Sequence, residues 1–443
     1  MIFLYRIVCL FLAFMLLMPL AVAEEKYTAF PEPLRITQKY EKKYITQTSY
    51  SMLYYPKTCQ PQVDAQLREA LDRMAAEGLE YLPAKTAIAD EAAMLDGGAT
   101  VYRTGKQWAS FLLSVAVLNG GKQLYMDFDS YAYDMLTGER LTIDDVVLES
   151  GFALVQAEAE KQLAAYFPQY AVDEEKLAAL CDVQQLRAVD FTLSPAFLQL
   201  HFASEALYDH AGVIMHVRIP YALLHEHLTQ AALEQTDNSR YKLVALTYDD
   251  GPTRKRTLAI LRTLRSGGLN ATFFVVGDRI RGASDLIMME HNAGFAIASH
   301  NYEHVYPSQM SGKVIAYRDK LNSELQALTG KGVSMMRAPG GHEEIYIEEK
   351  VGIPLIHWTL ASKDGKSTDF EPWDEAARLV RKITDGSIVL MHDLRLITEK
   401  YSAYLPQMLN ERGYLCVTVE ELFALRGIPL EPNTLYKDEA LLP

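Results

Sequence analysis

Cysteine is scarce in this 443-residue chain, with four in total, and no two of them form a C-x-x-C pair. This absence argues against cysteine zinc sites and against thioredoxin chemistry. Cys9 lies in an N-terminal apolar segment, which leaves Cys59, Cys181 and Cys416. Two interpretations of these three are open: a Cys59–Cys181 disulfide formed in an oxidising compartment, or three buried free thiols, which we prefer.

Positive charge is also in deficit, since 43 Lys and Arg face 57 Asp and Glu, for a net charge of −14. An acidic chain gains nothing from counterion release, so we exclude nucleic acid as a partner. The same charge argues against simple attachment to anionic membranes or wall polymers. At ~100–200 residues per domain, the length indicates two domains, with three as the alternative.

The N-terminus carries the pattern of a secretory signal. Arg6 precedes an apolar run at 7–18, and Ala21-Val22-Ala23 fits a small-x-small cleavage site, which predicts a signal peptide at 1–23. The alternative is an uncleaved membrane anchor, although the run is slightly short for a span of ~20 residues. Both interpretations place the remainder outside the cytoplasm, either secreted or in the cell envelope.

Residues 24–237 alternate between strand-like and helix-like segments, which indicates an α+β domain with antiparallel hairpins. Residues 44–55 are rich in Tyr, Thr and Ile, as strands are, and 63–79 carry apolar residues at helical spacing. Further strands are expected at 111–118, 124–133, 191–202 and 213–219. The histidines of this half are scattered, and we interpret them as satisfied surface or core residues: His201, His210, His216, His225 and His227.

A polar break at 237–240 predicts a domain boundary, followed by a second domain at 238–428 and a C-terminal tail at 429–443. Short apolar runs recur in this domain, at 243–248, 272–276, 295–299, 334–337, 355–359, 388–391 and 415–419. Candidate helices lie between them, at 256–265, 285–291, 317–328, 374–382 and 404–411. Several runs lack alternation, as parallel strands buried on both faces do. Seven strands with helical crossovers indicate an α/β fold, an incomplete TIM-like (β/α)7 barrel.

Polar residues follow four of these runs where each strand is expected to end. Two acids, two histidines, an arginine and a further histidine stand there: Asp249, Asp250, His300, His304, Arg337 and His392. The C-terminal ends of parallel barrel strands face one mouth, so we expect these side chains to converge on one site.

His300 and His304 have i,i+4 spacing, which directs both imidazoles the same way on a helical turn. One aspartate completes a two-histidine, one-carboxylate set that leaves positions open for water and substrate, as catalytic metal sites do. A lone H-x-x-x-H or Asp-Asp pair is usually a helix face or a solvated turn. Their occurrence at successive strand ends favours a metal site.

These residues stand in motifs that resemble the NodB-homology domain of carbohydrate esterase family 4, the polysaccharide deacetylases. The matching segments are T-Y-D-D-G-P at 247–252, A-T-F-F at 271–274, H-N-Y-E-H at 300–304, R-A-P-G-G at 337–341 and L-M-H-D at 390–393. They follow the family order and span nearly the whole C-terminal half.

The resemblance implies a role for each matched residue. Asp250, His300 and His304 would hold a divalent metal, usually Zn²⁺ in this family. Asp249 would stay off the metal and act as general base, and Arg337 would hold Asp249 in place.

The resemblance also implies roles in the hydrolysis of the amide bond for the remaining matched residues. The backbone N–H of Gly340 would help to stabilise the oxyanion, and His392 would be the general acid that protonates the departing amine. Histidine has a suitable unperturbed pKa for that acid, and a bound divalent metal can activate water at neutral pH.

The fourth family motif, usually D-x-x-D-W, is altered here. Asp364 matches the second aspartate, which in the family supports the catalytic histidine. Ala361 replaces the first aspartate, and Gly365 replaces the tryptophan that usually walls the acetyl pocket. Asn301 stands where Ser or Thr is usual. These departures leave the metal ligands, the base and the acid in place, but they put the shape of the pocket in doubt.

The N-terminal half has a looser resemblance, carried by N-G-G at 119–121, Y-A-Y-D at 131–134 and L-T-I-D-D at 141–145. It is similar to the extracellular domain of lysozyme-sensing anti-sigma factors and some multidomain peptidoglycan deacetylases. Together the resemblances imply an N-deacetylase acting on a β-1,4-linked amino-sugar polymer, with peptidoglycan favoured over a chitin-like glycan. Two alternatives stay open: an esterase for O-acetyl groups, and a glycan-binding or sensing protein that has lost turnover.

Overall fold

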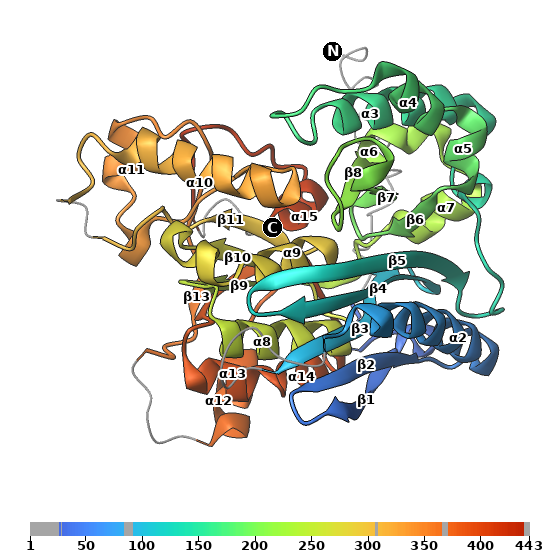
Figure 1. Cartoon of the computed structure of the whole chain (residues 1–443), viewed down its shortest axis with the longest axis horizontal. Helices are drawn as coiled ribbons and strands as arrows, with labels where there is room; N and C mark the ends of the chain where they lie inside the picture. Colours follow the sequence, from blue (N-terminus) through green and yellow to red (C-terminus); the bar gives the residue numbers. More distant parts are fainter. Residues whose placement is uncertain (1–25, 28, 84–91, 306–308, 366–370, 438–443) are drawn as a thin grey trace, which may run out of the picture.

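A computed structural model describes residues 26–27, 29–83, 92–305, 309–365 and 371–437 of the chain (Figure 1). The predicted signal peptide, at residues 1–23, lies outside the described residues. Within them, no helix combines the length and the apolar character that a bilayer span requires. The chain has an α/β fold with a parallel sheet in its C-terminal half.

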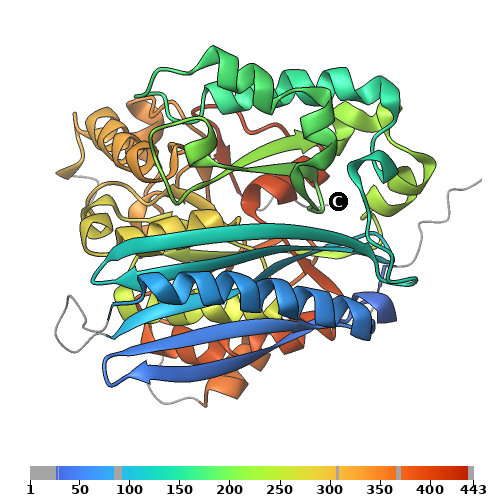
Figure 2. The ribbon, with the colours of Figure 1, turned by 45° about the vertical axis from the view of Figure 1, so that its right-hand side comes forward.

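The N-terminal half is built on a five-stranded sheet with the strand order β1-β2-β3-β4-β5. Its strands are β1 (Thr37–Thr46), β2 (Ser49–Lys57), β3 (Ala93–Thr104), β4 (Trp108–Asn119) and β5 (Lys122–Asp134). Neighbouring strands are antiparallel except β2 and β3, which are parallel and are connected through helix α2 (Pro61–Gly78). Figure 2 shows α2 lying along this sheet.

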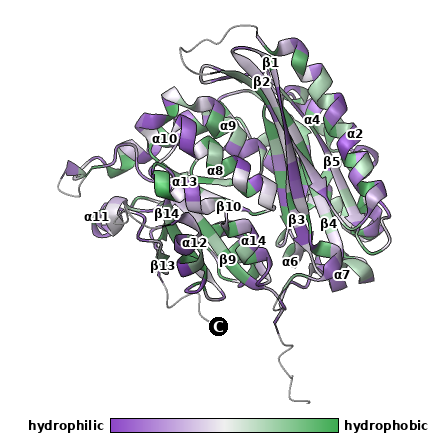
Figure 3. Cartoon of the chain, turned by 90° about the horizontal axis from the view of Figure 1, so that it is seen from below, coloured by the Kyte–Doolittle hydropathy of each residue, from purple (hydrophilic) through white to green (hydrophobic). Residues whose placement is uncertain are grey.

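Helix α2 confirms the helix predicted at 63–79. In Figure 3 it carries both purple and green segments, as an amphipathic helix does. Its buried residues include Val63, Leu67 and Leu71, which pack with the core of the sheet.

The single strand predicted at 44–55 was wrong, because the segment is a hairpin. The chain turns at 47–48, so that Tyr44 lies opposite Tyr50. Both arms are rich in Tyr, and no Gly, Pro or Asn marks the turn between them.

A three-stranded antiparallel sheet with the order β6-β7-β8 follows. Its strands are β6 (Asp190–Leu193), β7 (Phe197–Ala203) and β8 (Ile214–Pro220). The surrounding helices are α3 (Phe152–Ala164), α4 (Glu174–Leu180), α5 (Val183–Ala188), α6 (Tyr221–Leu224) and α7 (Gln230–Thr236). The strand predicted at 191–202 is therefore two strands, separated by a turn at 194–196.

The C-terminal half contains a six-stranded parallel sheet in the order β11-β10-β9-β14-β13, with β15 also paired to β9. Its strands are β9 (Lys242–Asp249), β10 (Ala271–Val275), β11 (Ala296–Ser299), β13 (Leu360–Ala361), β14 (Ser387–His392) and β15 (Tyr414–Cys416). The flanking helices are α8 (Arg254–Gly267), α9 (Ser284–Asn292), α10 (Val314–Thr329), α11 (Glu344–Glu348), α12 (Pro372–Val380), α13 (Leu396–Ser402), α14 (Leu405–Asn410) and α15 (Val419–Leu425).

The strand predicted at 334–337 is reduced to isolated bridges. Met336 pairs with Ser299 on one side and with Leu355 on the other. Leu355 begins β12 (Leu355–Ile356), which pairs in parallel with β16 (Leu435–Tyr436). Part of the segment predicted as a C-terminal tail therefore lies inside the fold, and Tyr436 is buried.

Alternate residues of the parallel strands pack on opposite sides. On β9, Val244 and Leu246 belong to the apolar cluster that includes Ile260 of α8. The intervening Ala245 lies in a second cluster, which includes Phe274 of β10. The C-terminal ends of the strands are thereby held in fixed positions beside one another.

The two halves share buried contacts. Asp96 of β3 is buried and pairs with Arg262 at 2.7 Å and Arg265 at 3.4 Å, both on α8. At the predicted boundary, Asn238 is also buried, and its side chain donates to the Pro195 carbonyl at 2.8 Å. Asn238 of the polar break is thus packed against the N-terminal half, while Asp237 and Ser239 are exposed.

Cys59, Cys181 and Cys416 are free thiols. The preferred interpretation of the cysteines is confirmed, except that Cys59 is exposed rather than buried. The interpretation of the scattered histidines also holds for His201 and His216, which are buried and lie 2.9 Å apart through their Nδ1 atoms.

Candidate active site

The predicted site residues stand at the C-terminal ends of neighbouring parallel strands. Asp249 ends β9, and its register partner on β14 is His392. On the other side, β10 pairs with β11, which ends at Ser299 directly before His300. The strand order therefore brings the acids and histidines to one edge of the sheet, as the sequence predicted.

Asp250, His300 and His304 form a candidate metal centre. One ligand atom of each lies within 4.8 Å of the other two. The Oδ1 atom of Asp250 is 3.4 Å from Nε2 of His300 and 3.2 Å from Nε2 of His304. Asp250 and His300 are buried, whereas the His304 side chain is 44% exposed, so one side of the centre is open.

Asp250 of this centre, and Asn301, which follows His300, adopt backbone conformations that L-residues rarely occupy. Asp250 has a φ of 78° and Asn301 has a φ of 70°. Such conformations cost free energy and concentrate at functional sites. Asparagine tolerates this region better than most residues, which suits the Asn301 that stands where the family usually has Ser or Thr.

The side chains fit a divalent cation. The Nδ1 atom of His300 lies 2.9 Å from the Arg337 carbonyl, so Nδ1 donates and Nε2 keeps its lone pair toward Asp250. Asp250 Oδ1 is buried and accepts no hydrogen bond from the described residues. Burial would raise the pKa of Asp250, but the neighbouring histidines lower it to about 2. An ionised, unpartnered oxygen between two imidazole nitrogens is a suitable cation ligand.

Asp249 is buried beside this centre and is held by a guanidinium. Nη1 of Arg337 donates to Asp249 Oδ1 at 2.8 Å and to the Thr247 hydroxyl at 2.7 Å. Arg337 is completely buried, and its Nε donates to the Ile356 carbonyl at 3.1 Å. Asp249 Oδ2 is 3.8 Å from Nδ1 of His300, so this carboxylate lies next to the candidate ligands but outside the three-residue set.

His392 is supported by the aspartate that matches the fourth motif. Its Nδ1 lies 2.8 Å from Asp364 Oδ1, and its backbone N–H donates to Asp364 Oδ2 at 2.8 Å. Burial would lower the pKa of His392, but the hydrogen bond and charge of Asp364 raise it above its ordinary value. This imidazole is therefore suited to carry a proton near neutral pH.

Gly340 and the altered fourth-motif residues, Ala361 and Gly365, lie in the same chain segments as these side chains. Gly340 is in the turn Pro339–Gly341, directly after Arg337 and Ala338. Ala361 ends β13 and is half-buried. A Cβ atom added at Gly365 would meet nothing within 4 Å. The tryptophan that the family usually has at this position is therefore replaced by open space.

Several supporting residues were not predicted from the sequence. The Thr398 hydroxyl donates to Asp364 Oδ2 at 2.7 Å, and the Thr257 hydroxyl donates to Asp393 at 2.5 Å. Glu343 is buried and forms a hydrogen bond with His357. Each of these contacts joins residues far apart in the chain, so no local spacing in the sequence could have identified them.

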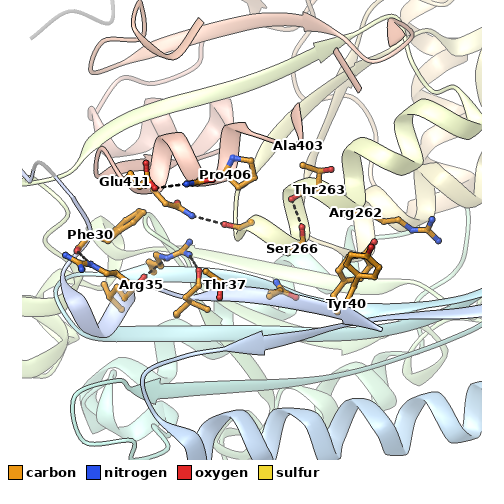
Figure 4. A pocket seen from close by; sticks show the side chains of 18 of the residues that line it. Phe30, Arg35, Thr37, Tyr40, Arg262, Thr263, Ser266, Ala403, Pro406 and Glu411 are labelled. Atoms are coloured by element: carbon orange, nitrogen blue, oxygen red, sulfur yellow. Dashed lines mark hydrogen bonds between the residues drawn. The ribbon is translucent and has the colours of Figure 1, made fainter. Parts of the chain in front are cut away.

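The chain also has a cavity of about 840 Å³ away from this centre, between β1 and the helices α8 and α14 (Figure 4). Phe30, Arg35, Tyr40 and Pro406 are among its lining residues. None of the predicted catalytic or metal-binding residues lines it.

Comparisons with known proteins agree with the site. Residues 236–352 match the family model of polysaccharide deacetylases. The chain is 31% identical over 204 residues to a peptidoglycan N-acetylglucosamine deacetylase of Listeria monocytogenes, which covers 45% of this chain and 42% of that protein. It is 26% identical over 192 residues to a peptidoglycan N-acetylmuramic acid deacetylase of Bacillus subtilis, which covers 43% and 40%. The chain thus spans less than half the length of either relative.

A solved structure is also similar, that of a family 4 acetyl xylan esterase from Clostridium thermocellum in complex with a cobalt ion. It is 28% identical and covers 44% of this chain and 98% of that one, with a TM-score of 0.40.

Proposed function

We propose that the C-terminal half of this chain, in which residues 236–352 match the polysaccharide deacetylase family model, hydrolyses N-acetyl groups of a β-1,4-linked amino-sugar polymer and releases acetate. One observation carries the proposal: Asp249 with Arg337 and His392 with Asp364 flank the centre formed by Asp250 and its histidines. A base and an acid on either side of a cation site are what amide hydrolysis requires.

We propose Zn²⁺ as the ion, held by Asp250, His300 and His304. Two imidazoles and one carboxylate are a ligand set that suits zinc and leaves room for substrate. A divalent ion bound there would polarise the acetyl carbonyl and make an adjacent water molecule more acidic.

The chain's own residues would move the protons. Asp249, fixed by Arg337, takes the proton of the attacking water. The Gly340 N–H donates to the oxygen of the acetyl carbonyl as negative charge develops on it. His392, protonated through the influence of Asp364, donates a proton to the amine nitrogen, since an amine anion is a poor leaving group.

We propose peptidoglycan as the polymer. The curated relatives from Listeria monocytogenes and Bacillus subtilis carry names that place them on peptidoglycan. The loose resemblance of the N-terminal half to domains of wall-directed proteins points the same way. The signal pattern at 1–23 supports export to the cell envelope, either secreted or anchored through the N-terminus.

Because the chain matches this family, we also propose that its parallel strands close into the family's incomplete seven-stranded barrel. Support comes from the bridges through Met336, which extend the sheet beyond β11 to β12. Inward residues of separate strands, Ala245, Phe274, Ile356 and Ile388, also share one apolar cluster, as residues inside a barrel do.

To test this, the purified chain is loaded with Zn²⁺ and incubated with three substrates: peptidoglycan, chitooligosaccharides and O-acetylated xylan. The acetate released from each substrate is measured. We expect release from the first two, and loss of more than a hundredfold in the Asp249→Asn and His392→Asn variants. Asp319→Asn, which alters an exposed carboxylate on α10, is the matched control. Release from acetylated xylan alone would replace the proposal with an O-acetyl esterase, and zinc binding without release from any polymer would favour a binding protein.

A further inference from the structure

Glu343 and His357 form a hydrogen-bonded pair beside the site that none of the family motifs contains. Glu343 is 3% exposed, and its Oε1 accepts from Nδ1 of His357. Burial would raise the pKa of Glu343, but the hydrogen bond and charge of His357 hold it below its ordinary value. A buried carboxylate requires such a partner, so the two side chains are maintained as a unit.

The ring of His357 is fixed against the turn that contains Gly340. It stacks on Trp358 with ring centroids 3.9 Å apart and an interplanar angle of 20°. Gly341 has a φ of 73°, and a Cβ there would lie 2.8 Å from Trp358 and 3.1 Å from His357. The two rings therefore pack directly on the backbone of the turn, at a position where any side chain larger than that of glycine would clash with them.

The same segment holds Arg337. Nε of Arg337 donates to the carbonyl of Ile356, the residue before His357, and Nη1 donates to Asp249. A shift of the chain at 356–358 would consequently move both the guanidinium and the turn. Glu343 follows the turn and His357 follows β12, so their hydrogen bond ties together the two segments on which these groups depend.

We propose that Glu343 and His357 are positioning residues, which fix the Gly340–Gly341 turn and the Arg337 guanidinium relative to Asp249. This inference rests on the proposed deacetylase function, in which Gly340 and Arg337 have their roles. Because those groups act on the developing charge and on the base, misplacing them lowers kcat more than it raises KM.

Four variants separate the hydrogen bond from the bulk of the ring. His357→Phe keeps a ring against Trp358 but removes the donor, whereas His357→Asn keeps a donor close to the position of Nδ1. Glu343→Gln keeps the acceptor without the charge, and Glu343→Leu removes it. His342→Ala, at an exposed neighbouring position, is the control.

We expect kcat for acetate release to fall about tenfold in His357→Phe and Glu343→Leu, with KM within about twofold of the wild type. His357→Asn and Glu343→Gln should recover kcat to within about threefold, and His342→Ala should match the wild type. Backbone amide exchange across 337–343 should speed up in His357→Phe and remain slow in His357→Asn.

The inference is wrong if His357→Phe keeps the wild-type kcat and the wild-type exchange, or if His357→Asn is damaged as severely as His357→Phe. If Glu343→Leu fails to fold, the comparison of His357→Phe with His357→Asn still tests whether the hydrogen bond positions the turn. Absence of acetate release by the wild type would overturn the proposed function. The amide exchange measurement would then still test whether the pair holds the segment.

Discussion

Nδ1 of His392 lies 2.8 Å from Oδ1 of Asp364, and the second carboxylate oxygen accepts from the His392 backbone N–H and from the Thr398 hydroxyl. Asp364 therefore has three donors and is 5% exposed. This arrangement fixes the orientation of the imidazole ring. The hydrogen bond to Asp364 uses Nδ1, so Nε2 is the nitrogen that can face the substrate. The aspartate thus sets both the direction and the charge of the proposed acid.

Replacing Asp364 with Asn should shift the pH dependence of the reaction. Asp364 raises the pKa of His392 against the effect of burial, so its loss lowers that pKa. The acid works only when protonated, so the alkaline limb of kcat should move to lower pH, with kcat at neutral pH reduced about tenfold or more. A pH profile of acetate release measures both.

Thr398→Val is the control for that variant, since it removes a hydrogen bond to Asp364 but keeps the carboxylate charge. Its alkaline limb should stay close to that of the wild type. An unshifted limb in Asp364→Asn would show that His392 is not the acid.

Metal binding should depend on His300 more than on His304. His300 is buried and oriented by the Arg337 carbonyl, whereas the His304 side chain is 44% exposed and can rearrange. Groups that orient a metal ligand in this way typically contribute 10–100-fold to metal affinity, so the oriented His300 should contribute more than the exposed His304. We expect zinc affinity, measured by calorimetry, to fall in the order wild type, His304→Gln, His300→Gln. Equal affinities in all three proteins would refute the assignment.

Removal of the metal should also abolish catalysis. A chelator should abolish activity in the wild type, and added zinc should restore it.

The chemistry of the site was predictable because it is local in sequence. Asp249, Asp250 and the 300–304 motif sit next to the strands that present them, and the C-terminal ends of parallel strands must meet. What the sequence could not predict is the set of long-range contacts that hold these groups. Glu343 with His357 and Asp364 with Thr398 are examples.

The N-terminal sheet shows a second limit. No strand is predicted at 93–104, because Gly97 and Gly98 interrupt the apolar pattern as a turn would. The segment is nevertheless the central strand β3. A Cβ at Gly97 would lie 2.8 Å from both Leu53 and Val115, so the glycine marks a close approach of neighbouring strands rather than a turn.

Asp96 should be necessary for the stability of the whole described fold. It is buried between the two halves and pairs with Arg262 and Arg265 of α8. Its replacement by Ala leaves two guanidinium groups without their carboxylate, which typically costs about 3–5 kcal/mol. We expect a single urea transition, shifted to lower denaturant, rather than separate unfolding of the two halves. Arg73→Ala, which removes an ion pair with Asp129 by truncating a side chain that is 57% exposed, should shift it by less than about 1 kcal/mol. An early transition confined to one half would contradict the shared core.

Acid should destabilise the fold through three buried histidines. His201 and His216 are joined through their Nδ1 atoms at 2.9 Å, and His216 Nε2 donates to the His291 carbonyl. Burial lowers the pKa of His201 and of His291 to about 3, and lowers that of His216 as well. In the unfolded chain these groups bind protons near pH 6.5, so their contribution is complete above that pH and is lost as pH falls.

The three together should remove about 4 kcal/mol of unfolding free energy between pH 7.5 and 5.5, measured by urea titration at both values. His201→Gln lacks one titrating group, so its loss over this interval should be about 1.3 kcal/mol smaller than in the wild type. His225→Gln, at a site that is not buried, should lose as much as the wild type. If His201→Gln loses as much stability as the wild type, His201 titrates in the folded chain as it does in the unfolded one, and it contributes no acid sensitivity.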